Sequence, residues 1–259
     1  MRRAINALSA VAAALLLLPV AAHAQEQTGR PASLDHIVVG LGAVYTPTYQ
    51  GADRYRTLPI PVTDVVRGHF FANLQNGVGF DVIQGDAVTV GASVTYTPGY
   101  RRKDVPDGIG ELSFGAGARM FASVRAGAAV LTLGGTKGFA WGTKGIVADV
   151  SLSYPLAISS RITLIPGIET SWADRKYNDR YFGVDAVQAQ ASGLPQFHAG
   201  QGFKDVSATI TANARLTKRI SLSLSGGSTR LLGRVQDSPI VVHRIRPTGI
   251  LSISYLLGS

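Results

Sequence analysis

The 259-residue chain contains no cysteine, so disulfides cannot hold it together and thiol chemistry is excluded. Beyond Ala24 it also lacks any apolar run close to the about 18 residues that a membrane-spanning helix needs. These two absences exclude a disulfide-rich secreted domain, a thiol enzyme and a mature protein that crosses a membrane with helices.

The first residues have the pattern of an export signal. Arg2 and Arg3 precede the apolar segment ALSAVAAALLLLPVAAHA, which ends in the small residues Ala22 and Ala24 around His23. This pattern predicts a secretory signal peptide over residues 1–24, with cleavage before Gln25. A transmembrane anchor is the alternative, but the apolar core is short and no stop-transfer flank follows it. We therefore expect residues 25–259 to form the mature, exported domain.

The charge balance is basic, with 25 Lys and Arg residues against 16 Asp and Glu residues and a formal net charge of +9. A basic protein can bind nucleic acid, but an exported one meets anionic lipid headgroups and lipopolysaccharide phosphates instead. We expect membrane lipid and lipopolysaccharide as partners, and no nucleic acid.

Regular alternation of apolar and polar residues dominates the mature chain. In VSATITANARLT, residues 206–217, apolar side chains occupy every second position, and Ser, Thr, Asn and Arg occupy the others. Side chains of a strand point to opposite faces at period two, so this segment has one apolar and one polar face. The same pattern is present in VTVGASVTYTP, VADVSLSYPL, RITLIPGIETSW and RISLSLSGG.

Alternation also occurs in soluble β-sandwiches, but three features favour a membrane barrel. The polar faces carry small hydroxyls and glycine instead of Lys and Glu. The strands match the about 9–11 residues of a tilted membrane strand and exceed the about 5–6 residues usual in globular proteins. Aromatic residues lie near strand ends, where interfacial girdles are expected: Tyr45, Tyr96, Tyr154, Trp172 and Tyr255. We predict an all-β fold, an antiparallel transmembrane β-barrel, because only closure pairs every backbone group in lipid.

The number of strands follows from how the connections alternate. Clear strands are predicted near residues 35–47, 86–98, 111–125, 127–137, 144–157, 160–175, 203–217, 219–232 and 247–257. Short and long connections alternate between them, as periplasmic turns and external loops do. The region between residues 47 and 86 is ambiguous, since it fits one long kinked strand or three short ones. The barrel is therefore predicted to have ten or twelve strands, because the number must be even.

The longest predicted connection spans residues 176–202. It is polar, rich in glycine and without any period. We interpret it as an irregular external loop. We also expect no apolar contact to fix it, because barrel strands already hold both of its ends.

Several long motifs resemble those of the MipA/OmpV family of outer-membrane proteins. The residues that carry the resemblance are YQGADRYRTLPIPV (49–62), FFANLQNGVGFDV (70–82), YFGVDAVQAQASGLPQFHAGQGFKDV (181–206) and LLGRVQDSPIV (231–241). The similarity runs from about Gly40 to the C-terminus.

This resemblance implies an outer-membrane barrel of a Gram-negative bacterium. It also implies a structural role, in which the barrel interacts with a murein transglycosylase or another murein-synthesis protein and serves as a scaffold. A small pore or uptake channel for small solutes is the alternative hypothesis, since the inward faces are polar. A barrel hydrolase is the third hypothesis.

Alternation directs charged and amide side chains into the barrel. Two interpretations stay open, because a barrel of this size lies between those filled by side chains and those with an aqueous channel. The side chains line a narrow polar pore, or they pair and form a plug. The predicted lumen-lining residues are Arg119, Arg125, Asp149, Glu169, Asn213 and Arg215.

The external loops offer candidate interaction residues. The run YRRKDVPD, residues 100–107, either meets lipopolysaccharide phosphates or forms a solvated loop whose charges partly compensate one another. The predicted external-loop interaction residues are Arg101, Arg102, Lys103, Tyr181, Phe182 and Asp237.

No sequence motif predicts catalysis, a cofactor or a metal site. None of the mature chain's histidines has a His or Cys partner three or four residues away, and no G-x-S-x-G elbow is present. We therefore predict a protein that is not an enzyme. The hydrolase hypothesis rests only on His198 and His243, which fall in predicted external loops near Asp205 and the Asp237-Ser238 pair in the sequence.

Overall fold

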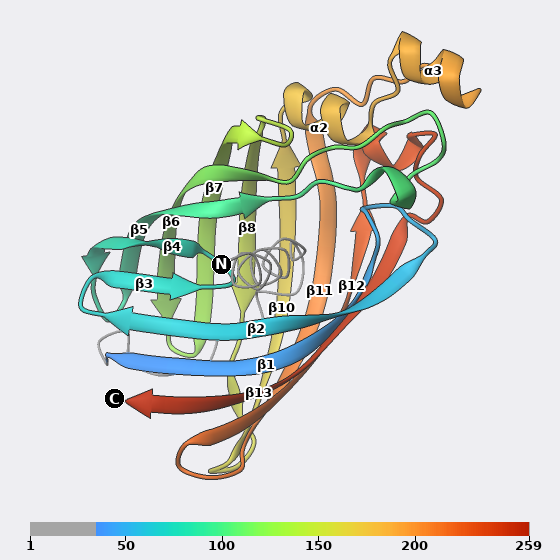
Figure 1. Cartoon of the computed structure of the whole chain (residues 1–259). Coiled ribbons are helices and arrows are strands. Elements are labelled where there is room, and N and C mark those ends of the chain that lie inside the picture. Colours follow the sequence, from blue (N-terminus) through green and yellow to red (C-terminus); the bar gives the residue numbers. More distant parts are fainter. Residues whose placement is uncertain (1–34, 259) are drawn as a thin grey trace, which may run out of the picture.

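The chain folds as a closed antiparallel β-barrel, seen in a computed structural model that describes residues 35–258 (Figure 1). The signal peptide predicted for residues 1–24 lies outside the described residues. The strands are β1 (His36–Pro47), β2 (Tyr55–Arg67), β3 (Phe70–Asn73), β4 (Gly77–Gln84), β5 (Val88–Thr97), β6 (Gly115–Ala126), β7 (Ala129–Trp141), β8 (Ile146–Ser153), β9 (Leu156–Ala157), β10 (Ile162–Ala173), β11 (Gly202–Arg215), β12 (Ile220–Leu231) and β13 (Ile245–Gly258).

Each strand pairs with its neighbours in the chain, and the pairing of β1 with β13 closes the ring. β8 and β9 both pair with β10 and are separated only by Tyr154 and Pro155, so they act as one interrupted strand. The barrel therefore has 12 strands. This confirms the predicted fold class and decides between ten and twelve, because the ambiguous region contributes β2, β3 and β4.

The two faces of the wall follow the alternation in the sequence. Outward side chains such as Leu41, Met120 and Ile210 are more than half exposed in the isolated chain, which is the surface that lipid would cover. Inward positions on the same strands carry small or hydrogen-bonded residues, for example Thr211, whose hydroxyl lies 2.9 Å from that of Ser225. Among residues 35–258, no helix is long and apolar enough to cross a membrane.

Short turns lie at one end of the barrel and long loops at the other, as predicted. The short turns are at residues 68–69, 85–87, 127–128, 158–161 and 216–219. The longest loops, at residues 48–54, 98–114, 174–201 and 232–244, gather at the opposite end, which we take as external.

The long connection between β10 and β11 is not irregular, so that expectation was wrong. It contains α2 (Arg175–Phe182) and α3 (Ala186–Ser192). The carboxylate of Asp174 caps α2 by accepting a hydrogen bond from the Tyr177 amide at 2.7 Å. Asp185 and Gln188 form a capping box at the start of α3, and Gly193 ends that helix with a positive φ of 72°.

The expectation that no apolar contact fixes this loop was also wrong. Its aromatic residues belong to a hydrophobic core that the long external loops build together, which we call the cap. Tyr177 and Tyr181 stack on α2 with ring centroids 5.9 Å apart, and Tyr100 from the β5–β6 loop meets Tyr181 edge-on at 5.3 Å. The buried residues of the cap are Tyr49, Ala52, Tyr100, Val105, Ile109, Leu112, Ala173, Tyr177, Tyr181, Phe182, Val184, Ala199, Leu231, Val235 and Ile240.

The β3–β4 hairpin is much shorter than its neighbours and leaves a gap in the barrel wall. β3 pairs with β2 only at residues 64–67, and the β4–β5 pairing ends at Val78 and Val94. Residues 55–63 of β2 and 95–97 of β5 therefore pair on one side only, with β1 and β6. We call this gap, which lies between β2 and β5 on the external side of the turn at residues 74–76, the notch.

The cap core yields a stability prediction. Phe182 is fully buried in the cap, so Phe182→Ala should destabilise the cap by about 3–5 kcal/mol, the usual cost of truncating a buried aromatic residue. Limited proteolysis of the folded barrel should then cut within residues 174–201, while the heat-dependent gel shift of the barrel is retained. Val187→Ala on α3 is the control, because Val187 is 75% exposed and its truncation should leave the cleavage rate unchanged.

Candidate functional site

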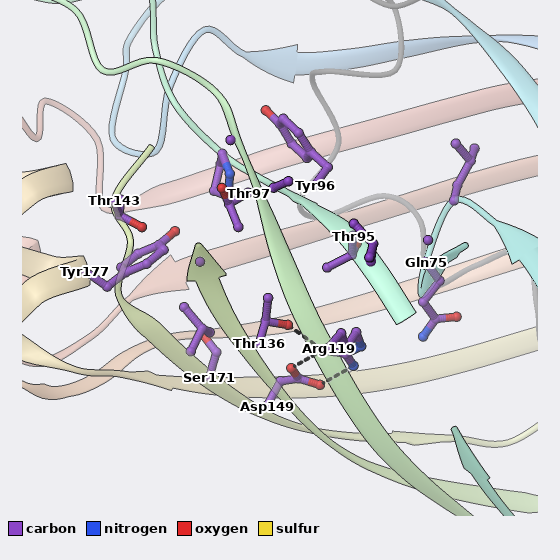
Figure 2. A pocket seen from close by; sticks show the side chains of 18 of the residues that line it. Gln75, Thr95, Tyr96, Thr97, Arg119, Thr136, Thr143, Asp149, Ser171 and Tyr177 are labelled. Carbon is purple, nitrogen blue, oxygen red and sulfur yellow. Dashed lines mark hydrogen bonds and ion pairs between the residues drawn. The ribbon is translucent and has the colours of Figure 1, made fainter. Parts of the chain in front are cut away.

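The barrel encloses a cavity of about 450 Å³ beneath the cap (Figure 2). Its lining comes from most strands of the wall and from the β3–β4 turn, and Tyr177 of α2 reaches it from the cap. Neutral amide and hydroxyl side chains alternate in this lining with charged ones. We treat this cavity as the candidate site because paired charged side chains and neutral polar ones line it together.

Arg119 organises one side of the cavity. Its guanidinium donates two hydrogen bonds to Asp149, at 2.7 and 2.8 Å, and a third to Thr136 at 3.2 Å. Arg119 is on β6 and Asp149 on β8, so the pair spans β7. It does so at Gly134, where any side-chain carbon would collide with both charged groups. Glycine at this position therefore leaves room for the ion pair in its observed geometry.

Arg119 also holds the β3–β4 turn inside the lumen. Its Nε donates to the Asn76 side-chain oxygen at 3.1 Å, and the Ser93 hydroxyl donates to the Asn76 carbonyl at 2.5 Å. Leu74 of the same turn packs against the buried Val44 and Ile60 on the inner face of β1 and β2. The turn is thus fixed by polar contacts on one side and by an apolar contact on the other.

A second charged group lies at the external end of the cavity. Lys204 forms an ion pair with Asp205, and Asp205 accepts a hydrogen bond from the Ser171 hydroxyl at 2.6 Å. The Arg246 guanidinium lies 4.0 Å from the same carboxylate. Lys204 and Asp205 are chain neighbours, yet both face inward. The β10–β11 register shift between Ser171 and Trp172 makes Lys204 an extra, bulged residue, which explains this orientation.

Buried apolar side chains lie on the periplasmic side of the cavity. Four of them point inward, one each from β2, β3, β6 and β10, and each is at most 7% exposed. On β3, β6 and β10, this residue lies closer to the short turns than the residues of the same strand that line the cavity do. The rings of Phe71 and Phe121 meet edge-on, with centroids 5.7 Å apart. The residues of this apolar layer are Val62, Phe71, Phe121 and Ile165.

The cap covers the external side of the cavity. The Tyr49 hydroxyl donates to the Ile240 carbonyl at 2.7 Å, and the Tyr181 hydroxyl accepts from the Gln50 amide at 3.2 Å. Burial raises the pKa of Tyr49 and of Tyr181 to about 12, so both hydroxyls keep their protons at neutral pH. These bonds join loops that are far apart in the sequence and hold the cap over the lumen.

The residues predicted to line the lumen do not all meet in one place. Arg119, Asp149 and Glu169 line the cavity. Arg125 and Arg215 lie near the short turns at the periplasmic end, where Arg215 donates to the Ser160 carbonyl. Asn213, two residues before Arg215 on β11, is half-buried and lies outside the cavity lining.

The residues predicted for external interactions fall into an exposed group and a buried group. Arg101, Arg102 and Lys103 are exposed on the β5–β6 loop. Asp237 is exposed too, and it forms an ion pair with Arg244 at 2.9 Å. The structure places Tyr181 and Phe182 elsewhere, because both are buried in the cap and do not reach the surface.

The loop histidines have no catalytic arrangement around them. His198 is exposed and lies 3.8 Å from Asp179, and among residues 35–258 no serine hydroxyl bonds to His198 or His243. The Ser238 hydroxyl instead donates to the Phe182 carbonyl inside the cap. Within the same residues, no cluster of three His, Asp or Glu side chains could hold a metal ion.

The sequence did not predict three polar residues that lie at or beside the cavity: Asn76, Lys204 and Arg246. Simple alternation assigns Lys204 and Asp205 to opposite faces, because it cannot anticipate the bulge. Arg246 follows the alternation of β13 and faces inward, but it falls at the predicted edge of that strand. Asn76 belongs to a turn, where no periodicity is available.

The comparison with family models decides the family. The family described as MltA-interacting protein MipA matches residues 39–257, which is most of the chain. The chain belongs to the MipA family. The resemblance inferred from the four motifs is therefore confirmed, and the protein is an outer-membrane barrel of that family.

Solved structures of outer-membrane proteins resemble the MipA-family barrel only in outline. The NanC porin is 8% identical, with a TM-score of 0.42 and coverage of 85% of this chain and 98% of that one. The KdgM porin is 7% identical, with a TM-score of 0.38 and coverage of 86% and 98%. The Pseudomonas putida toluene transporter TodX is 10% identical, with a TM-score of 0.38 and coverage of 89% and 92%. No curated protein matches. At these identities no functional statement rests on the likeness.

The buried ion pair yields a second prediction. Arg119→Met leaves Asp149 without its partner in the lumen and should destabilise the barrel by about 3–5 kcal/mol, because an unpaired buried charge remains. Urea unfolding of the protein in phosphatidylcholine vesicles measures this loss. Arg119→Met combined with Asp149→Leu should recover at least half of it.

Arg244→Met is the matched control for this experiment. The Arg244–Asp237 pair has 57% of each side chain exposed, so its loss should cost at most about 1 kcal/mol. Equal effects of Arg119→Met and Arg244→Met would contradict a structural role for the Arg119–Asp149 pair.

Proposed function

We propose that this MipA-family protein is a non-enzymatic scaffold, an outer-membrane anchor that binds a murein transglycosylase or another murein-synthesis protein. The observation that carries the proposal is that buried side chains lie in the lumen on both sides of the cavity. An apolar layer lies beneath the cavity and the cap lies above it. A barrel with its lumen occupied in this way is suited to hold a partner at the membrane more than to conduct solutes along its axis.

The periplasmic rim supplies a surface for such a partner. Basic side chains gather at and beside the short turns, where the acidic residues, Asp35, Asp64, Asp81 and Asp86, are fewer. A positively charged rim attracts a negatively charged protein surface and accelerates its association. The basic residues of this rim are Arg67, Arg125, Arg161, Arg215, Lys218 and Arg219.

The rim can be tested by charge reversal. The triple variant Arg161→Glu, Lys218→Glu and Arg219→Glu should retain about tenfold less murein transglycosylase in a pull-down with the purified barrel, and retention by the unaltered protein should fall with added salt. These side chains are exposed, so the reversal should leave folding intact, as the heat-dependent gel shift will show.

The external loop offers a matched control. Arg101→Glu, Arg102→Glu and Lys103→Glu make the same change of charge at exposed residues on the opposite end of the barrel. This variant should retain the partner fully. If the unaltered barrel retains no murein-synthesis protein, or if both triple variants behave alike, the scaffold proposal fails.

A small pore is the second candidate, and the polar cavity of about 450 Å³ favours it. Such a pore would need the cap and the apolar layer to open. We expect residues 25–259 to show no discrete conductance steps in a planar bilayer, because two barriers lie in series. Phe71→Ala with Phe121→Ala should stay silent, and steps should appear only when Tyr181→Ala loosens the cap as well. Discrete steps from the unaltered protein would favour the pore over the scaffold.

A further inference from the structure

The notch exposes a strand edge that has no partner strand within the described part of the chain, and the sequence of that edge contains prolines that suit an unpaired position. Residues 55–63 of β2 pair with β1 without a register shift, and among residues 35–258 no strand pairs with their other edge. This stretch contains Pro59 and Pro61. In an antiparallel ladder alternate residues donate to the same neighbour, so these two prolines remove donors from one and the same edge. Proline is tolerated at an edge that has no partner strand.

The notch lies at the depth of the outer leaflet. Tyr45, which is half-exposed and stacks on Tyr55 with ring centroids 4.9 Å apart, marks the external aromatic girdle. Tyr45 is opposite Thr57 in the β1–β2 register, so the rest of the notch edge, residues 58–63, lies on the membrane side of this girdle. An open strand edge facing hydrocarbon is costly, and it is tolerated where it lines a polar cavity.

The cavity extends to the notch. Val78 and Val94 point outward at the end of the β4–β5 pairing and are each 54% exposed, yet both line the same cavity as Arg119 and Asp149. Leu74, from the turn beneath the notch, adds a further apolar contact to this lining. The cavity is therefore apolar at the wall and polar in the lumen, and the two regions are continuous.

The polar region offers neutral hydrogen-bonding groups more than free charge. Arg119 is paired with Asp149, and Lys204 is paired with Asp205. Half-buried amide and hydroxyl side chains also line this region, such as Gln75 and Thr95, which are labelled with Arg119 in Figure 2. A group that enters this region meets partners for hydroxyls and amides, and the carboxylates of Asp149 and Asp205 are already paired with cations.

We propose that the notch is a lateral entrance from the outer leaflet and that the cavity binds a neutral, single-chain amphiphile. The acyl chain occupies the notch against Leu74, Val78 and Val94, and the hydroxyl-bearing head lies in the lumen. A cavity of about 450 Å³ is within the range of about 300–1,000 Å³ that suits one drug-sized ligand, which is the size of a single-chain amphiphile. The cavity lining reaches the outward residues Val78 and Val94, so the notch is the route of entry that we propose.

Photo-crosslinking tests this site directly. The mature barrel is placed in phosphatidylcholine nanodiscs that contain a monoacylglycerol with a diazirine on its acyl chain, and the crosslinked residues are mapped by mass spectrometry. We expect crosslinks at residues 74–76 and at the lumen-facing Thr95, and an excess of unlabelled monoacylglycerol should suppress them. A two-chain phosphatidylcholine with the same diazirine should label only outward residues such as Leu41 and Met120.

A pair of bulky substitutions separates the notch from other routes. Val94→Trp at the notch should reduce the Thr95 crosslink by about tenfold or more, equivalent to about 1.4 kcal/mol in binding. Val150→Trp on the lipid-facing side of β8 should leave it unchanged, because Val150 is also an exposed outward valine but is far from the notch along the sheet. Val78→Trp provides a second blocking variant if Val94→Trp does not fold.

Three results would overturn the proposal. Crosslinks confined to outward residues would mean ordinary lipid contact with the barrel surface. Lumen crosslinks that survive both Val94→Trp and Val78→Trp would mean that the chain enters elsewhere. Equal lumen labelling by the two-chain lipid would exclude selection for a single chain. None of these results depends on a murein-synthesis partner, so the site can fail or hold independently of the scaffold function.

Discussion

The structure depends on one constraint, that every backbone donor and acceptor within lipid must find a partner. Closure of β1 on β13 meets this constraint around the ring, and it requires strands whose outward faces are apolar along their full length. The notch departs from this constraint. It is the place where a run of strand edge at membrane depth is left unpaired, and two prolines on β2 accompany it.

Within the barrel, the corresponding requirement is that buried charges be paired. Arg119 and Asp149 meet across Gly134, and Lys204 and Asp205 meet because a bulge turns both inward. These pairs do more than fill space, since Arg119 also fixes the β3–β4 turn through Asn76. The ion pair, the turn and the notch therefore form one structural unit, and a change at Arg119 would reach the wall of the barrel.

The cap and the apolar layer define how the lumen can be used. Buried aromatic residues of α2 pack with residues from the other long loops and cover the external end, while Phe71 and Phe121 pack edge-on in the lumen on the periplasmic side of the cavity. The polar cavity between them has its polar surface in the lumen and its apolar surface at the wall. This arrangement explains why a polar interior, which alone would suggest a channel, is compatible with a barrel that anchors a partner.

The sequence by itself determined the barrel, the lipid-facing residues and the alternation of short turns with long loops, because period-two alternation is a local property of each strand. It placed Arg119, Asp149 and Glu169 on inward faces for the same reason. Only the tertiary structure decided the twelve strands, the inward turn of Lys204, and the cap. The Lys204 orientation depends on a register shift against β10, and the cap on contacts such as Tyr49 with Ile240, which are 191 residues apart. No local pattern records such contacts, since they form only when closure of the barrel brings its loops to the same end.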